Sequence, residues 1–255
     1  MKKTLSYRLR DSRSQTDSLF SLREQYRVNH GNRGSNIALD GLSDHYLKKL
    51  KQKNMHLMHL LEYTGKNQFP VMKPFTIPDS EFEIYSYKER NKHASKPWGV
   101  HFFGNDYTFN HAITDKLEKT TASLSDCDLI FAPDCSMYVD MPLPLNKMSI
   151  FQSRFAGAYW QYCGFNVVQT ASWGDAKSLE YCFEGLAKQS DTAICGVGHN
   201  FSKSAKRLWI YAVQELVTQK SPTRLIIYGN PKEVMPDFGV PVVFIKDHIT
   251  QHFRA

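Results

Sequence analysis

A chain of 255 residues with 42% hydrophobic and 22% charged residues is long enough to bury a full core, and this composition is typical of a globular protein rather than a disordered or fibrous one. No apolar run approaches the length needed to cross a membrane, and the basic start at Lys2 and Lys3 is followed by polar residues instead of the apolar stretch of a signal peptide. We therefore expect a cytoplasmic protein with no membrane partner.

The net charge of +7 is concentrated in one segment of the chain. Residues 1–53 contain 12 Lys or Arg against 5 Asp or Glu, whereas the rest of the chain contains 20 of each. A localised basic segment is typical of proteins that bind a polyanion, most often nucleic acid. A solvated leader that only keeps the protein in solution would show the same balance, so the two interpretations remain open.

The N-terminal part is expected to differ from the rest. Residues 1–40 are polar, rich in Ser and Arg, and predict a basic, partly disordered arm, and residues 41–255 predict a single α/β domain. Leucines at helical spacing predict an amphipathic helix over 43–63, packed on that domain, with Ser43 as its N-cap and Gly65 at its end.

Further along, short apolar runs alternate with helical patterns. Strands are expected at 100–103, 128–133, 165–170, 192–197, 224–228 and 240–245, and helices at 111–124, 146–163, 177–187 and 204–219. Such alternation with short connections predicts an α/β fold with a mostly parallel sheet.

The strand ends bear on the choice between a barrel and an open sheet. Polar or glycine-containing segments follow at least five successive strands, at Asp106, Asp134, Trp173, Gly198 and Tyr228. An open doubly wound sheet uses only the strands at its switch point for a site, whereas every strand of a barrel ends at one mouth. The sequence therefore favours an incomplete or distorted (β/α) barrel over an open doubly wound sheet.

Asp134 and Asp106 are the candidate catalytic residues, because each follows a predicted strand. Paired carboxylates can hold a divalent metal or divide into a general acid and a general base. Each could equally cap the turn or helix that follows it. Asp175, just before the helix expected at 177–187, is predicted to act as such an N-cap. The cofactor stays unknown at this point, with a divalent metal as one option.

Four side chains near the same strand ends are candidate binding residues. Ser136 follows Asp134, and Tyr228 ends a strand before Gly229. Arg154 could clamp a phosphate or carboxylate, or form a structural ion pair. Trp173 could stack on a base or sugar, or close the end of a barrel.

The segment Gly196-Val197-Gly198-His199-Asn200 lies between a predicted strand and a predicted helix, where backbone amides often bind phosphate. Gly196, Gly198 and Asn200 are therefore candidate binding residues. The segment lacks the third glycine of a dinucleotide fingerprint and the Lys-Ser/Thr of a P-loop, so a tight turn that requires glycine explains it equally well.

Several unusual segments occur in order and together resemble a family of domains of unknown function from bacteriophages and mobile elements. They are Val-His-Phe-Phe-Gly-Asn-Asp-Tyr-Thr-Phe (100–109), Ala-Pro-Asp-Cys-Ser-Met-Tyr-Val-Asp-Met-Pro (132–142), Ser-Arg-Phe-Ala-Gly-Ala-Tyr-Trp-Gln (153–161), Ser-Trp (172–173), Cys-Phe-Glu-Gly (182–185) and Tyr-Gly (228–229). The resemblance covers roughly residues 65–235 and implies a phage or mobile-element context without implying an activity. This sequence departs from the family pattern at Asn105, where an acidic residue is often expected.

The expected function is therefore a nucleic-acid- or nucleotide-binding protein of a phage or mobile element. A phosphoester-processing activity at the carboxyl ends of the parallel strands is one form of it, with affinity supplied by residues 1–53. The alternative is a non-catalytic accessory or host-interaction protein that uses the same cleft for binding only.

Overall fold

The computed structural model describes residues 52–92, 97–197, 202–229, 235–245 and 250–253. The chain divides into two compact units. The smaller comprises Met1–Leu60 and His111–Asp126, and the larger comprises Leu61–Asn110 and Cys127–Ala255. The predicted arm at 1–40 and most of the predicted basic segment at 1–53 lie outside the described residues.

The larger unit is built on a sheet of seven parallel strands within the described residues, with an eighth strand pairing antiparallel at one edge. The parallel strands are β3 (Ser80–Ser86), β4 (Trp98–His101), β5 (Leu129–Phe131), β6 (Val167–Ala171), β7 (Thr192–Cys195), β8 (Leu225–Tyr228) and β9 (Val242–Ile245), and the edge strand is β10 (Thr250–Phe253). Their order in the sheet is β10-β3-β4-β5-β6-β7-β8-β9, so the parallel strands lie side by side in chain order.

This order is that of a nearly closed barrel. A doubly wound sheet reverses its strand order at a switch point, and no reversal occurs here. The two edge strands also lie near each other, because the four residues between Ile245 of β9 and Thr250 of β10 can span at most roughly 18 Å. The predicted incomplete or distorted (β/α) barrel is confirmed.

Side chains from the strands fill the barrel interior. One buried cluster combines members of six of the parallel strands: Phe82, Ile84, Leu129, Phe131, Val168, Ala193, Ile226 and Ile245. Alternate residues of the same strands face outward, so Ile194 and Ile227 belong to a second cluster on the helical side. Near the mouth the rings of His101 and Tyr228, from β4 and β8, lie 4.8 Å apart.

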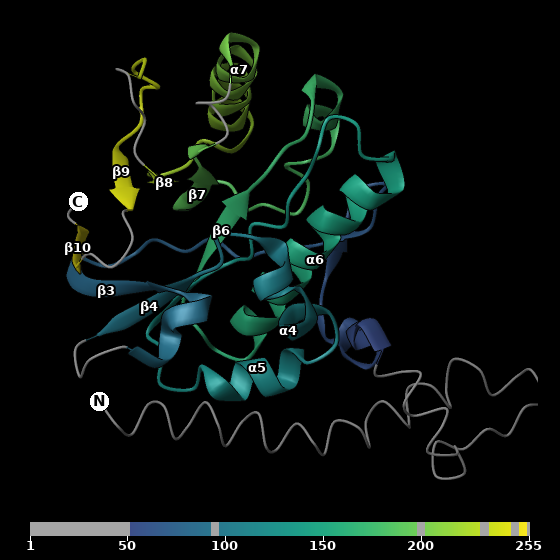
Figure 1. Cartoon of the computed structure of the whole chain (residues 1–255), viewed down its shortest axis with the longest axis vertical. Coiled ribbons are helices and arrows are strands. Elements are labelled where there is room, and N and C mark those ends of the chain that lie inside the picture. The colour runs from purple at the N-terminus through teal and green to yellow at the C-terminus, as the bar shows by residue number, and fades with distance from the viewer. Residues whose placement is uncertain (1–51, 93–96, 198–201, 230–234, 246–249, 254–255) are drawn as a thin grey trace, which may run out of the picture. The chain divides into compact units, whose positions relative to one another are not determined.

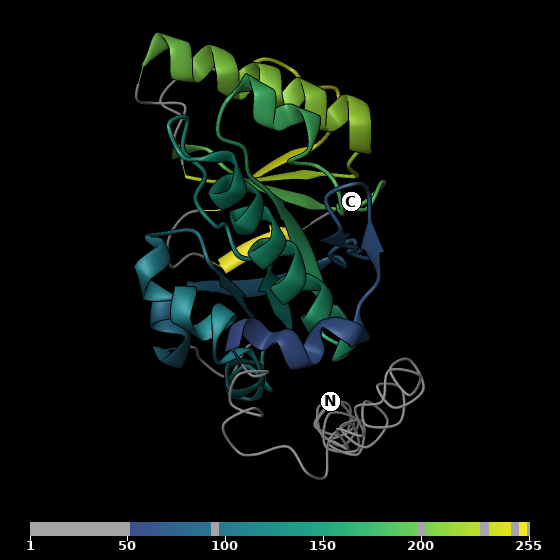
Figure 2. The same ribbon diagram turned by 90° about the vertical axis from the view of Figure 1, so that its right-hand side faces the viewer.

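Two long helices cover the outside of the sheet. Helix α6 (Leu143–Tyr162) packs against β6, and α7 (Lys203–Lys220) contributes Trp209, Val213 and Leu216 to the outer cluster with strands β7 and β8. Figures 1 and 2 show these helices beside the sheet. Ser202 caps α7 by accepting a hydrogen bond from the backbone N–H of Ala205. Among the described residues no helix combines the length and apolarity that crossing a bilayer requires.

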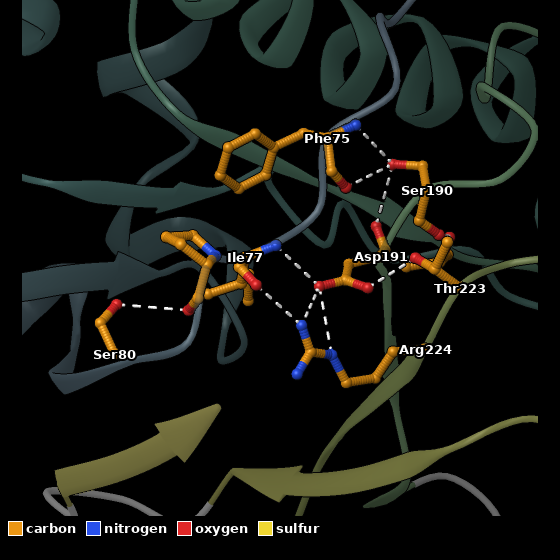
Figure 3. Close-up of polar contacts among 9 residues, drawn as sticks. Phe75, Ile77, Ser80, Ser190, Asp191, Thr223 and Arg224 are labelled. Atoms are coloured by element: carbon orange, nitrogen blue, oxygen red, sulfur yellow. Dashed lines mark hydrogen bonds and ion pairs between the residues drawn. The ribbon is translucent and has the colours of Figure 1, made fainter. Parts of the chain in front are cut away.

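A polar network closes the end of the barrel opposite the mouth (Figure 3). Asp191, directly before β7, accepts a hydrogen bond from the backbone N–H of Ile77 at 2.9 Å and pairs with Arg224, directly before β8, at 2.7 Å. Arg224 also donates to the carbonyl of Ile77, and Thr223 donates to Asp191. The segment that leads into β3 is thereby tied to the amino ends of β7 and β8.

Three predicted helices differ from the structure. The described part of the expected helix at 43–63 is a 3₁₀ segment, η2 (Gln52–Leu60), with left-handed backbone at Lys53 and Asn54. The residues after η2 form a hairpin of β1 (Tyr63–Thr64) and β2 (Phe69–Pro70). Gly65 therefore lies in the turn of this hairpin and not at the end of a helix.

The helix expected at 111–124 is broken into α4 (Asn110–Thr114) and α5 (Leu117–Ser123). The helix expected at 177–187 is the short 3₁₀ segment η5 (Ala176–Glu180), followed by turns. Gly185 has a φ of +79°, and a Cβ at this position would clash with the carbonyl of Pro70, so the helix cannot extend to 187 as expected. Two further 3₁₀ segments are η3 (Tyr87–Lys92) and η4 (Asp106–Thr108).

The described part of the smaller unit is held by polar contacts of its own. Asn54 donates to the carbonyl of Ile113 at 2.6 Å, and Nε2 of His56 lies 2.9 Å from Oε2 of Glu118. These contacts join η2 to α4 and α5, although 59 and 62 residues separate the partners in sequence.

Candidate functional site

A cavity of about 410 Å³ lies at the carboxyl ends of the parallel strands, within the larger unit. Five successive strands supply residues to it: Asn105 after β4, Asp134 after β5, Ser172 and Trp173 after β6, Cys195 at the end of β7, and Tyr228 at the end of β8. Its volume is in the range of small-molecule sites. The barrel geometry brings these side chains together, as the strand-end pattern predicted for Asp134, Trp173 and Tyr228.

Asp134 is the only residue with a carboxylate side chain among the described residues that line the cavity. Its Oδ1 accepts a hydrogen bond from Oγ of Ser172 at 2.6 Å. The pKa of Asp134 is raised to about 6, mainly by burial and also by the nearby carboxylate of Asp106, although hydrogen bonds from Ser172 and Cys195 oppose the shift. A carboxyl group with a pKa near neutrality can take up and release a proton under physiological conditions.

Asp106 lies close to Asp134 but has a different role in the structure. Its Oδ2 accepts from the backbone N–H of Ser136 at 2.9 Å and its Oδ1 from Oγ of Ser136 at 2.8 Å. Both carboxylate oxygens therefore position the β5 end, and Asp106 is not among the described lining residues. Ser136 lines the cavity, but its hydroxyl proton is directed to Asp106.

Arg154 is buried on α6 away from the cavity. Its guanidinium donates to the backbone carbonyls of Thr170 at 2.7 Å, Cys182 at 2.9 Å and Glu184 at 3.3 Å. Burial lowers the pKa of Arg154 to about 10, so it remains charged at neutral pH. The structure thus shows a side chain that joins β6 to the segment after η5, where the sequence predicted an anion clamp or an ion pair.

Aromatic rings form much of the cavity wall. Trp173 is half-buried, stands edge-on to Phe183 and lies 6.4 Å from Trp209 of α7. Tyr228 stacks on Phe103 with ring centroids 4.9 Å apart. The rings are therefore fixed by packing before any ligand is present.

The glycine segment is only partly described. Gly198 and Asn200 lie outside the described residues. A Cβ at Gly196 would lie 2.7 Å from Cγ2 of Ile227, so this glycine allows β7 and β8 to pack closely. Asp175 accepts a hydrogen bond from the backbone N–H of Ser178, which confirms its predicted role as an N-cap.

Cys195 and Trp209 are among the lining residues that the sequence analysis did not select. Cys195 ends β7, and the strand-end rule that selected Asp134 could have found it. Trp209 lies in the second turn of α7 and donates from Nε1 to the carbonyl of Cys195 at 2.8 Å. No local sequence signal marks Trp209, because only the packing of α7 on the barrel brings its ring to the mouth.

Metal binding and cysteine chemistry have weak geometric support in the described residues. No group of three His, Cys, Asp or Glu side chains in these ranges is arranged to hold a metal ion. Cys135 is buried, and burial raises its pKa well above the usual value, so its thiol stays protonated.

Residues 61–244 match the model of a protein family described as Domain of unknown function (DUF4417). The chain belongs to this family. The match covers most of the larger unit and residues 111–126 of the smaller one, and it agrees with the resemblance inferred from the sequence over roughly residues 65–235.

Two curated proteins of phages are similar to this DUF4417 chain. The "Gene 1 protein" of Mycobacterium phage L5 is 28% identical over 196 residues, which cover 74% of this chain and 82% of that protein. The "Gene 1 protein" of Mycobacterium phage D29 is 29% identical over 177 residues, which cover 69% of this chain and 65% of that protein. No solved structure matches the chain.

Proposed function

We propose that this DUF4417 protein binds nucleic acid or a nucleotide, with one base held in the cavity at the barrel mouth. The observation that carries the proposal is the combination of Trp173, Trp209 and Tyr228 with the hydrogen-bonding groups of Asp134 and Asn105 in one cavity. Aromatic faces bind bases by stacking, and polar groups at the edge of the ring provide selectivity.

Phosphate affinity would come from outside this cavity. No Lys or Arg occurs among the described lining residues, so we expect the sugar and phosphate of a bound nucleotide to extend away from the cavity. Residues 1–53, which carry the whole net charge of the chain, are the segment that we expect to supply affinity for a polyanion in the cytoplasm of the host cell.

An enzymatic step is the second level of the proposal. A phosphoester-processing activity would use Asp134 as general acid or base, since its raised pKa suits proton transfer near neutrality. The non-catalytic alternative, an accessory protein with the same cavity, is favoured by Asp106, because both of its oxygens are occupied by Ser136 and it supplies no second carboxylate to the cavity.

Electrophoretic mobility of labelled single- and double-stranded DNA and RNA, with and without magnesium or manganese, tests both levels. A salt-dependent shift without cleavage supports binding alone. Metal-dependent cleavage that Asp134→Asn abolishes supports the enzyme. Absence of both a shift and cleavage would overturn the nucleic-acid form of the proposal.

The cavity itself is tested by Trp173→Leu. Loss of one stacked base costs about 1–3 kcal/mol, so the affinity should fall by roughly fivefold to 150-fold. Tyr211→Leu is the matched control, because Tyr211 is an aromatic residue of α7 that is 50% exposed and does not line the cavity. Equal affinities for the two variants would contradict a base at the mouth.

A further inference from the structure

The polar groups of the cavity differ in what they can offer a ligand. Ser136 directs its hydroxyl proton to Asp106, and Ser172 directs its own to Asp134. A carboxylate has about four lone-pair sites, so Asp134 keeps acceptor capacity after it accepts from Ser172. Asp134 is therefore the strongest acceptor among the described lining residues.

Asp134 is also held in a fixed position by three strand ends. It follows β5, accepts from Ser172 directly after β6, and receives a hydrogen bond from Cys195 at the end of β7. A carboxylate oriented in this way before binding loses little freedom when a ligand arrives.

No cationic side chain lies among the described lining residues to compete for this carboxylate. A planar ligand with N–H groups on its edge would donate hydrogen bonds to the carboxylate of Asp134. The rings of Trp173 and Tyr228 would pack against the faces of the same ligand. Two adjacent N–H groups match the two oxygens of a carboxylate, and such charge-assisted pairs are stronger than neutral ones.

We propose that Asp134 selects a base with two adjacent donors on its edge, of the guanine type, whose ring N–H and 2-amino group both donate to the carboxylate. This inference rests on the proposed function and names the ligand class of the same cavity. Adenine and cytosine present an amino donor beside a ring acceptor, and uracil presents a ring donor between two carbonyls, so none of them offers the matching pair.

The protonation state of Asp134 sets a condition on this selectivity. Burial raises the pKa of Asp134 to about 6, and the titratable groups around it are Asp106, Cys135 and Cys195, with Tyr138 and Tyr228 also lining the cavity. Above this pH the ionised carboxylate accepts both donors of guanine. Below it the protonated group offers one donor and one acceptor, which suits adenine or cytosine instead.

The experiment is an isothermal calorimetric titration of the full chain with guanosine, inosine, adenosine, cytidine and uridine, at pH 7.5 and at pH 5.0. It measures the affinity for each nucleoside. Inosine is the matched ligand control, because it lacks only the 2-amino group of guanosine. One hydrogen bond to a charged group contributes about 1.5–3 kcal/mol, so guanosine should bind at least tenfold more tightly than inosine at pH 7.5. This preference should decrease at pH 5.0.

Asp134→Asn should weaken guanosine binding at least tenfold and shift the preference towards adenosine or cytidine, because an amide presents a donor beside an acceptor. Asp140→Asn is the matched control, since it removes the same charge from an exposed position that does not line the cavity. The comparison of guanosine with inosine needs only the native chain and so does not depend on how either variant folds.

Equal affinities for guanosine and inosine, or tighter binding of adenosine, cytidine or uridine at pH 7.5, would overturn the guanine assignment and leave the proposed function in place. Absence of binding by every nucleoside, together with no shift of any nucleic acid, would overturn the proposed function itself.

Discussion

At the amino end of the barrel, Asp191 is fully buried and pairs with Arg224, whereas at the mouth Asp134 lies among hydroxyl, thiol and aromatic groups with the carboxylate of Asp106 nearby. The first carboxylate also accepts from the backbone of Ile77 and from Thr223, so it joins three segments of the chain. The second accepts from Ser172 and has a raised pKa. We infer that the closed end stabilises the barrel and that the mouth retains an incompletely compensated charge that a ligand can use.

The largest expected effect is at the closed end. Arg224→Met should lower the free energy of unfolding by about 3–5 kcal/mol, because it leaves the buried carboxylate of Asp191 without its counter-charge. Urea denaturation measures the loss. In the double variant with Asp191→Asn the cost should be well below the sum of the single changes. A loss under about 1 kcal/mol for Arg224→Met would contradict the importance of this ion pair.

Substitution of Arg154 tests whether this buried arginine, which the sequence made a candidate binding residue, contributes to ligand binding or to stability. Arg154→Met should cost about 3 kcal/mol, because three backbone carbonyls lose a donor, and it should leave the affinity of the folded protein for nucleosides unchanged. The control is Arg207→Met, which removes an exposed arginine of α7. Reduced affinity with unaltered stability would show instead that Arg154 contacts the ligand.

The pH dependence of stability tests the mouth carboxylate. Because the pKa of Asp134 rises from 3.8 to about 6 on folding, the folded chain retains this proton over a range in which the unfolded chain has lost it. Asp134 therefore makes the free energy of unfolding decrease as the pH rises from about 4 to 7, by about 2 kcal/mol. This contribution should be absent in Asp134→Asn. Denaturant titrations at pH 4.5 and 7.5 measure it, and identical pH dependence in the two proteins would contradict the raised pKa.

The smallest effect concerns Asp175, a carboxylate whose role is local. Asp175→Ala removes the N-cap of η5 and should cost about 1 kcal/mol in thermal or urea unfolding. The control, Asp140→Ala, removes an exposed carboxylate and should cost less. A cost equal to that of the control would show that the cap contributes nothing measurable.

The sequence correctly predicted those elements that depend on residues close together in the chain. The alternation of strands and helices, the cap at Asp175 and the polar ends of β5, β6 and β8 follow from short patterns, and the structure contains them. The helices expected at 43–63, 111–124 and 177–187 differ in extent from the structure. Lys53 and Asn54 have left-handed backbone, α4 and α5 are separate helices, and the backbone at Gly185 is incompatible with a helix.

The sequence by itself determined that polar residues end successive strands and that such strands favour a barrel. Only the tertiary structure decided which of these residues share a cavity, since this depends on the direction of side chains across strands far apart in sequence. In the structure Asp106 accepts hydrogen bonds from Ser136, and Arg154 donates to backbone carbonyls. Cys195 and Trp209 line the same cavity as Asp134. The pairing of Asp191 with Arg224 has the same origin: two residues 33 positions apart meet because β7 and β8 are neighbours in the sheet.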